Sequence, residues 1–97
     1  MAKAYWVVSY RAVHDPERIP AYGELATPAI QAGGGRILAR GGQVVAHEAG
    51  LPLRTVVVEF DSFQAAVDTH DGDAYQKALA VLGDAVERDF RIVEGVD

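Results

Sequence analysis

The fold is decided by Gly34-Gly35-Arg36-Ile37-Leu38-Ala39-Arg40-Gly41-Gly42 and Val56-Val57-Val58-Glu59-Phe60. Each tract is an apolar strand pattern that lies next to a helix pattern. Strands are therefore predicted at residues 36–40 and 55–60, and we expect them to pair antiparallel. Glycines bend the chain after the first of these strands, and residues 43–47 are expected to continue in an extended conformation before a turn-rich loop.

Further elements follow outward from these tracts. Aromatic and β-branched residues predict a strand at 3–13, and a fourth strand is expected at 87–94. A helix is predicted to begin at Asp15-Pro16-Glu17 and to end at Gly33-Gly34-Gly35. A second helix, capped by Asp61 or Ser62, is interrupted at 71–73, where Asp73 and Gln76 resemble a capping box.

The order strand-helix-strand-strand-helix-strand predicts an α+β fold of the ferredoxin-like βαββαβ type. Its four-stranded antiparallel sheet should be covered by two helices on one face. Val56, Val58 and Phe60 alternate along one strand and are expected to meet the helices. The opposite face is mixed rather than polar, which favours a partly enclosed cavity or a subunit contact over open water. We therefore expect a homodimer in which the two sheets face each other.

Composition narrows the class of protein. The 97 residues suit a single domain spanning 1–97, and the formal net charge of −5 argues against nucleic acid and anionic membrane surfaces as partners. The chain has no cysteine, so a thiolate metal site and a cysteine nucleophile are excluded. Because no secretory signal or membrane-length apolar run is present, a cytoplasmic location is expected.

The chain resembles the domain of unknown function 1330 family over nearly its whole length. The most specific part of the resemblance is the Gly-Gly-Arg-x-Leu-x-Arg-Gly-Gly stretch at 34–42. The family usually has Ser-Pro-Glu-Tyr in its second helix, where this chain has Gly72-Asp73-Ala74-Tyr75 and matches only at the tyrosine. The family is similar to the dimeric α+β barrel superfamily. That similarity implies a homodimer with a ligand pocket between the sheet and the helices.

Arg40 is the strongest candidate for ligand binding. Next to Gly41 and Gly42, its guanidinium could present an unobstructed fork to a carboxylate. The alternative is a salt bridge from Arg40 to Glu59 or Asp89 that stabilises the end of the strand.

Two residues are candidates for proton transfer. Glu59 lies in an otherwise apolar strand, where burial would raise its pKa and suit it to act as a general base. The alternative is that an arginine pairs with it. His47 could overlook a pocket beyond the glycine bend, or it could be an exposed loop histidine.

The aromatic residues could line a pocket or form the core and dimer contacts. Among them, Tyr5 and Tyr75 are candidate ligand contacts, and Trp6, Tyr10 and Tyr22 belong to the same group. Asp68, His70, Asp71 and Asp73 do not have the spacing of an EF-hand loop, so no metal site is predicted, and no cofactor is expected.

Three functions remain open at this point. The resemblance implies a cofactor-independent monooxygenase or isomerase that acts on a small hydrophobic or anionic molecule. Arg40 would then anchor an anionic group, while Glu59 or His47 moves protons. The second function is a non-catalytic small-molecule-binding or stress-associated dimer, and the third is a module that binds protein partners.

Overall fold

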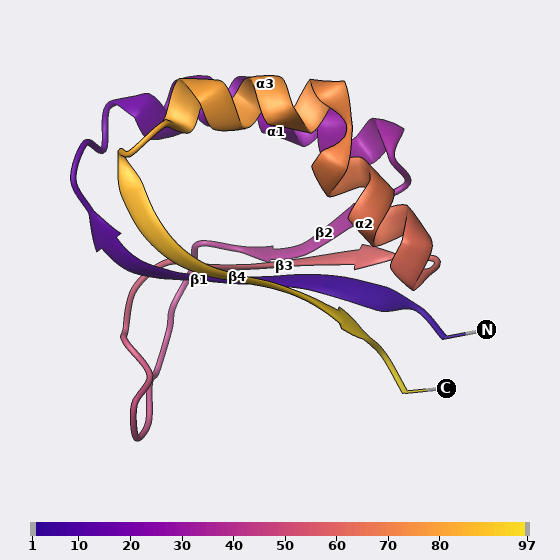
Figure 1. The fold of residues 1–97 in the computed structure, drawn as a ribbon. Coiled ribbons are helices and arrows are strands. Elements are labelled where there is room, and N and C mark those ends of the chain that lie inside the picture. Colours follow the sequence, from indigo (N-terminus) through magenta and orange to yellow (C-terminus); the bar gives the residue numbers. More distant parts are fainter. Residues whose placement is uncertain (1, 97) are drawn as a thin grey trace.

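The computed structural model describes residues 2–96, which form one four-stranded antiparallel sheet with three helices. The elements follow in the order β1 (Ala4–Val13), α1 (Arg18–Ala32), β2 (Arg36–Arg40), β3 (Thr55–Phe60), α2 (Phe63–Asp71), α3 (Asp73–Leu82) and β4 (Val86–Glu94). The strands lie in the order β2-β3-β1-β4. The predicted ferredoxin-like βαββαβ fold is confirmed, with the second helix divided into α2 and α3. All the helices lie on one side of the sheet (Figure 1).

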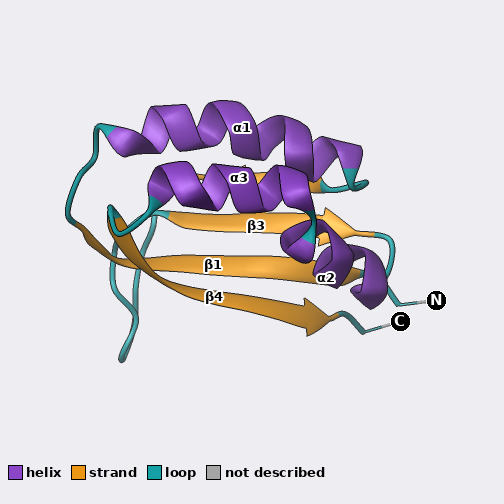
Figure 2. Ribbon diagram, turned by 45° about the horizontal axis from the view of Figure 1, so that its top comes forward, coloured by secondary structure: helices purple, strands orange, loops and turns teal. Residues whose placement is uncertain are grey.

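The two faces of the sheet differ because side chains alternate along each strand. In β1, Trp6 and Val8 are 1% and 2% exposed and face the helices, whereas Tyr5 and Val7 point the other way and are half-buried. Val58 and Phe60 of β3 are fully buried, as the alternation predicts. The helix-covered face therefore carries the core, and α1 and α3 lie side by side above it (Figure 2).

Trp6 fastens the sheet to the helical layer. Its ring lies 5.1 Å from that of Phe60 and 4.8 Å from that of Tyr75, measured between ring centroids. Its indole N–H donates to the Ala66 carbonyl of α2 at 3.0 Å. Since a buried indole N–H needs an acceptor, this bond fixes the position of α2 over β1.

Gly35 explains why the decisive tract begins with glycine. A Cβ at this position would lie 2.6 Å from Cγ2 of Ile30 and 2.9 Å from Cζ of Phe60. Neither buried neighbour has room to move, because the interior is close-packed. Only glycine, which has no Cβ, therefore lets the backbone between α1 and β2 lie this close to Ile30 and Phe60.

Several local predictions are corrected by the structure. The helix α1 begins at Arg18 with Glu17 as its N-cap, rather than at Pro16 with Asp15 as its cap. The Asp15 carboxylate accepts the Glu17 amide at 3.2 Å and pairs with Arg18. Ser62 does cap α2, since its hydroxyl accepts the Ala65 amide at 3.1 Å.

The predicted capping box of α3 is wrong. The N-cap of α3 is Gly72, without a side-chain cap, and Gln76 donates instead to the His70 carbonyl at 2.8 Å. The hydrogen bond from Gln76 therefore satisfies a carbonyl group that the end of α2 would otherwise leave without a donor.

The connection between β2 and β3 pairs with no strand at residues 43–47. It projects beyond the face of the sheet that the helices leave open (Figure 1). Among residues 2–96, every helix falls short of the length and apolar character that crossing a lipid bilayer requires.

Candidate functional site

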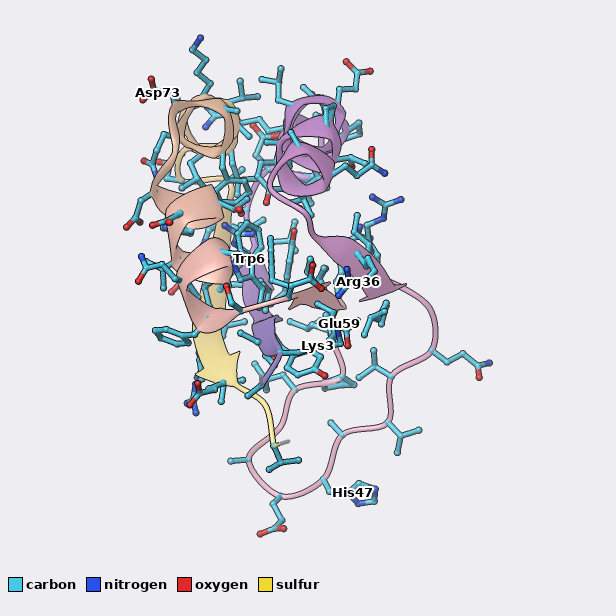
Figure 3. The ribbon with its side chains drawn as sticks, turned by 90° about the vertical axis from the view of Figure 1, so that its right-hand side faces the viewer. Lys3, Trp6, Arg36, His47, Glu59 and Asp73 are labelled. Atoms are coloured by element: carbon cyan, nitrogen blue, oxygen red, sulfur yellow. The ribbon has the colours of Figure 1, made fainter. Side chains whose placement is uncertain are left out.

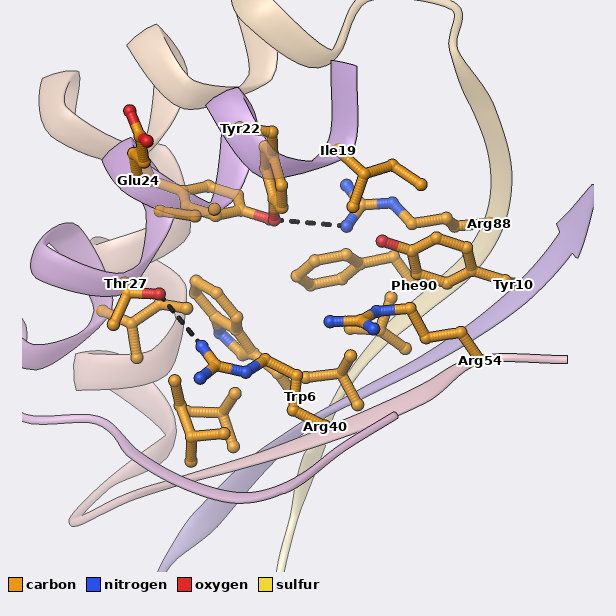
Figure 4. A pocket seen from close by; sticks show the side chains of 18 of the residues that line it. Trp6, Tyr10, Ile19, Tyr22, Glu24, Thr27, Arg40, Arg54, Arg88 and Phe90 are labelled. Atoms are coloured by element: carbon orange, nitrogen blue, oxygen red, sulfur yellow. Dashed lines mark hydrogen bonds between the residues drawn. The ribbon is translucent and has the colours of Figure 1, made fainter. Parts of the chain in front are cut away.

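A cavity of about 560 Å³ lies between α1 and the helix-covered face of the sheet. Its walls are largely apolar, with Trp6, Val8 and Phe90 from the sheet and Ile19 and Ile30 from α1. Cavities of this size and character are typical of small-molecule sites. The cavity is also lined by polar side chains that enter from several elements (Figure 4).

Three arginines line this cavity, each from a different part of the chain. Arg40 ends β2, Arg54 precedes β3 and Arg88 lies near the start of β4. Arg40 donates to the Thr27 hydroxyl of α1 at 3.0 Å, and Arg88 donates to the Tyr22 hydroxyl at 3.3 Å. Within residues 2–96, none of the three guanidinium groups forms an ion pair with a carboxylate.

Arg54 has an unsatisfied donor. Its Nε is buried and has no hydrogen-bond partner among the described residues. A buried N–H without an acceptor costs free energy, so such groups are uncommon in native structures. Figure 4 shows the Arg54 guanidinium among the side chains that line the cavity. An acceptor supplied by a bound molecule would satisfy it.

Gly41 leaves the room in which the Arg54 side chain lies. Its φ of +76° is a backbone conformation that favours glycine, and a Cβ there would lie 3.2 Å from Nη1 of Arg54. Gly42 has a similar φ of +74°, but a Cβ there would meet nothing within 4 Å. The first glycine therefore positions a cavity arginine, and the second only shapes the turn.

Arg88 is held by aromatic rings. Its guanidinium carbon lies 5.9 Å, 5.4 Å and 5.3 Å from the ring centroids of Tyr10, Tyr22 and Phe90. Burial works against the charge, but the hydroxyl groups of Tyr75 and Tyr22 outweigh it, and the pKa of Arg88 is raised. Arg88 is therefore a fixed cation at every physiological pH.

Two tyrosines meet beside Arg88. The hydroxyl oxygens of Tyr22 in α1 and Tyr75 in α3 lie 2.5 Å apart. Tyr75 is fully buried, and this burial, reinforced by Tyr22 and opposed by Arg88, raises its pKa far above the ordinary value of 10.0. Its hydroxyl therefore stays protonated at neutral pH.

The charge of the cavity is opposite to that of the chain. The protein has a net charge of −5, yet the described lining residues include three arginines and one acid, Glu24. Glu24 is exposed, and in Figure 4 its carboxylate points away from the guanidinium groups. Low-dielectric walls strengthen the attraction of such a cationic site for an anion.

The predicted ligand residues are only partly brought together. Arg40 and Tyr75 line the cavity, and Gly41 lies beside Arg54, while Gly42 is exposed in the turn. Tyr5 lies on the opposite face of the sheet, where its hydroxyl donates to Glu59 at 3.1 Å.

Of the two interpretations of Glu59, pairing with an arginine is confirmed and the raised pKa is wrong. Arg36 pairs with the Glu59 carboxylate at 3.0 Å, and Tyr5 donates a hydrogen bond to it. These two contacts, the one from Arg36 above all, outweigh the effect of partial burial, so the pKa of Glu59 is lowered and not raised. Arg40 pairs with neither predicted carboxylate, because Glu59 pairs with Arg36 and Asp89 pairs with Arg91 at 2.9 Å. Figure 3 shows Arg36, Glu59 and Lys3 close together.

His47 is exposed on the projecting loop, far from Trp6 in Figure 3. It lines a second, smaller hollow with residues of that loop and of β1. Among residues 2–96, no group of three histidine, aspartate or glutamate side chains is arranged to hold a metal ion. The catalytic roles considered for His47 and Glu59 stay predictions, and neither residue lines the arginine-containing cavity.

Sequence reasoning missed Arg54, Arg88 and Thr27. A signal for Arg88 was present, because it shares the helix-facing side of its strand with Phe90 and Ile92. A charged residue on an otherwise apolar face needs a partner or a function. Arg54 and Thr27 have no comparable sequence signal.

Comparison with solved structures shows the same fold at low sequence identity. A protein of unknown function from Rhodopseudomonas palustris, RPA0582, has a TM-score of 0.74 and 16% identity, covering 99% of this chain and 84% of its own. A proposed antibiotic biosynthesis monooxygenase from Caulobacter crescentus has a TM-score of 0.63 and 14% identity, covering 99% and 92%.

A dimeric ferredoxin-like protein of unknown function from Thermobifida fusca has a TM-score of 0.55 and 12% identity, covering 96% of this chain and 91% of its own. No curated protein matches the chain. The family described as "Domain of unknown function (DUF1330)" matches residues 3–96, which is nearly the whole length. The resemblance seen in the Gly-Gly-Arg tract is thereby confirmed, and the chain belongs to the DUF1330 family.

Proposed function

We propose that the cavity binds a small organic anion, with a carboxylate on its arginines and an apolar body against its walls. One observation carries the proposal. Three guanidinium groups face an apolar cavity of an acidic protein, and none of them has a carboxylate partner among residues 2–96.

The energetics of burial support an anionic ligand. A cation that is removed from water needs a counter-charge or several acceptors. This requirement falls on Arg54, which is half-buried and whose buried Nε has none of the described groups as an acceptor. Arg40 is exposed at the edge of the cavity, where the Thr27 hydroxyl accepts one of its hydrogen bonds. A carboxylate has enough lone pairs to accept from two guanidinium groups at once, and charge-assisted bonds of this kind are the stronger ones.

A cofactor-independent monooxygenase or isomerase acting on such an anion is the second candidate. It is favoured by the Tyr22 and Tyr75 hydroxyls beside Arg88 and by the similarity to the protein described as a proposed monooxygenase. Glu59 and His47 lie outside the cavity, so a catalytic version of the proposal uses Tyr22 as the proton-carrying group.

The charge requirement is tested with two ligands of nearly the same shape. Titration calorimetry compares 4-phenylbutanoate with the neutral 4-phenylbutanamide. We expect the carboxylate to bind roughly ten- to a hundredfold more tightly, since a hydrogen bond to a charged group contributes about 1.5–3 kcal/mol. Equal affinity for the two compounds, or binding of neither, would overturn the proposal.

Arg40→Met and Arg91→Met form a matched pair of variants. Arg40 lines the cavity, whereas Arg91 pairs with Asp89 on the open face. Arg40→Met should weaken binding of 4-phenylbutanoate about tenfold or more, and Arg91→Met should leave it unchanged. An equal loss in both variants would mean that the carboxylate is attracted by overall charge and not by this site.

We also propose that a second copy of the chain covers the open face of the sheet. Half-buried Val7 and Val57 and exposed Val93 give this face an apolar strip between its ion pairs, and the Thermobifida fusca relative is described as dimeric. Sedimentation equilibrium should report a dimer at micromolar concentration, and Val57→Glu should convert it to a monomer. A wild-type monomer would contradict this proposal and would favour the alternative of a different protein partner.

A further inference from the structure

The Tyr22 hydroxyl occupies a position that the carboxylate alone does not explain. It lies on the cavity wall, beside the apolar body that the proposed ligand would place there. Its oxygen accepts a hydrogen bond from Nη1 of Arg88 at 3.3 Å and lies 2.5 Å from the hydroxyl oxygen of Tyr75. The direction of the bond between the two tyrosines decides what Tyr22 offers to a ligand.

Burial fixes that direction. Tyr75 is 0% exposed, so its hydroxyl hydrogen needs an acceptor inside the protein. Arg88 is a donor only, and among residues 2–96 the Tyr22 oxygen is the hydrogen-bond partner of the Tyr75 hydroxyl. If Tyr22 donated instead, the hydrogen of Tyr75 would be buried without an acceptor. Tyr75 therefore donates and Tyr22 accepts.

The hydrogen of Tyr22 is then left for the cavity. A phenol oxygen has two acceptor positions, and Tyr75 and Arg88 fill both. Within the described residues, no further partner accepts the Tyr22 hydrogen. Two donated bonds also polarise the hydroxyl and strengthen it as a donor. Tyr22 thus presents one directed donor to a ligand, and it has no remaining capacity to accept one.

We propose that the preferred ligand is an oxo acid, in which a keto oxygen accepts from Tyr22 while the carboxylate lies on the cavity arginines. This inference rests on the proposed function. A keto oxygen is an acceptor without a hydrogen, which suits a site that offers a donor and no free acceptor. A ligand without the oxygen leaves the Tyr22 hydrogen without a partner, and sites built in this way discriminate against such analogues.

The test compares three ligands with one carbon skeleton: 4-phenylbutanoate, 2-oxo-4-phenylbutanoate and 4-oxo-4-phenylbutanoate. Dissociation constants are measured by calorimetry with the full chain. We expect one of the oxo acids to bind at least about tenfold more tightly than the parent acid. Tyr22→Phe should remove this preference and leave the affinity for the parent acid nearly unchanged.

Tyr10→Phe and Tyr75→Phe are the control variants. Tyr10 is a buried tyrosine of the same cavity, and its substitution should retain the preference for the oxo acid. Tyr75→Phe leaves the Tyr22 donor in place but removes one of the two bonds that polarise it, so the preference should be smaller than in the wild type and should not be abolished. The ¹³C resonance of a labelled keto carbon should shift downfield on binding to the wild type and not to Tyr22→Phe, and this reports the hydrogen bond directly.

The outcomes separate the two proposals. If 4-phenylbutanoate binds but neither oxo acid binds more tightly, the oxo-acid inference is wrong and the anion site stands. A preference that survives Tyr22→Phe, without a change in the ¹³C shift, overturns the inference in the same way. If none of the three acids binds, the proposed function fails, and the inference fails with it.

Discussion

The two faces of the sheet treat arginine in opposite ways. On the open face, Arg36 pairs with Glu59 and Asp61, and Arg91 pairs with Asp89 through two hydrogen bonds. On the helix-covered face, the cavity arginines contact hydroxyl groups and aromatic rings but no carboxylate of the described chain. Charge on the open face is neutralised within the fold, whereas charge in the cavity remains available for a ligand.

The degree of exposure alone therefore does not identify which charged residue is functional. Glu59 is more enclosed than most charged groups of the chain, with a side chain 19% exposed, yet its partners account for it fully. Arg54 is distinguished by what it lacks, since its Nε is buried without an acceptor among residues 2–96. Unmet hydrogen-bonding capacity points to function better than burial does.

The largest effect is expected for Arg54→Met, which tests whether the buried arginine of the cavity serves binding or structure. Removal of the guanidinium should weaken binding of 4-phenylbutanoate at least tenfold, since a charge-assisted contact is lost. The same change removes a buried unsatisfied N–H, so the free energy of unfolding should rise by about 1 kcal/mol. Calorimetric titration and urea denaturation measure the two effects. A variant that binds normally, or that loses stability, would show that Arg54 is a structural residue.

Gly41→Ala and Gly42→Ala test how the cavity is shaped. Both positions have φ near +75°, so each alanine should cost about 1–2 kcal/mol of stability. Only the alanine at 41 also approaches Nη1 of Arg54, at 3.2 Å, and it should therefore weaken ligand binding as well. Thermal unfolding and calorimetry of the two variants provide the comparison. Equal effects on binding would mean that Gly41 does not position Arg54.

The ion pairs of the open face should make the stability of the protein depend on acid pH. Arg36 lowers the pKa of both Glu59 and Asp61. Tyr5 adds to this effect on Glu59, and Lys3 adds to it on Asp61. Their contribution to stability is complete above the ordinary values of 4.5 and 3.8 and is lost as the pH falls toward the lower values of the folded state.

Tyr75 should act in the other direction. Burial raises its pKa above the ordinary value of 10.0, so its contribution is complete below that pH and is lost as the pH rises above it. Urea denaturation from pH 3 to pH 11 measures the loss of stability in acid and the loss in alkali. Tyr75→Phe should reduce the alkaline loss, and Glu59→Gln should reduce the acid loss. Glu59→Gln should also reduce a smaller part of the alkaline loss, because Glu59 raises the pKa of Tyr5 through their hydrogen bond. If Tyr75→Phe changed the loss of stability in acid, the assignment of the two faces would be wrong.

The smallest effect is expected for Arg36→Met. This substitution breaks an ion pair to Asp61 that lies largely in solvent and one to the more enclosed Glu59, which keeps its hydrogen bond from Tyr5. It should therefore lower the urea midpoint only slightly. It should leave binding of 4-phenylbutanoate unchanged, and a high salt concentration should reduce the difference from the wild type. A loss of binding in this variant would show that the open face contributes to the site.

The strand patterns predicted the fold because alternation depends only on local sequence. Val58 and Phe60 face the helices as expected, and the same alternation already placed Glu59 on the other side. The partner of Glu59 depends on the register of β2 against β3, which sets Arg36 opposite Glu59, and single-strand patterns do not contain that register.

The candidate site was predicted only in part for a related reason. Arg40 was found because its neighbouring glycines mark an unusual backbone. Arg54 lies outside the strands, and Thr27 acquires its role only where α1 passes over the end of β2. The third cavity cation, Arg88, could have been found from its position two residues before Phe90. Arg54 and Thr27 become part of the site only through the tertiary contact between α1 and the sheet.

The loop between β2 and β3 begins directly after Arg40 and ends at Arg54. Two of the three cavity cations are therefore the ends of one loop, whose middle projects beyond the open face (Figure 1). Any contact that spreads or closes the base of this loop also changes the separation of two guanidinium groups on the far side of the sheet. A change in the sequence or length of residues 42–53 would leave both arginines in the chain, whereas a one-residue slip at either end of the loop would replace a cation with a neighbour of different chemistry.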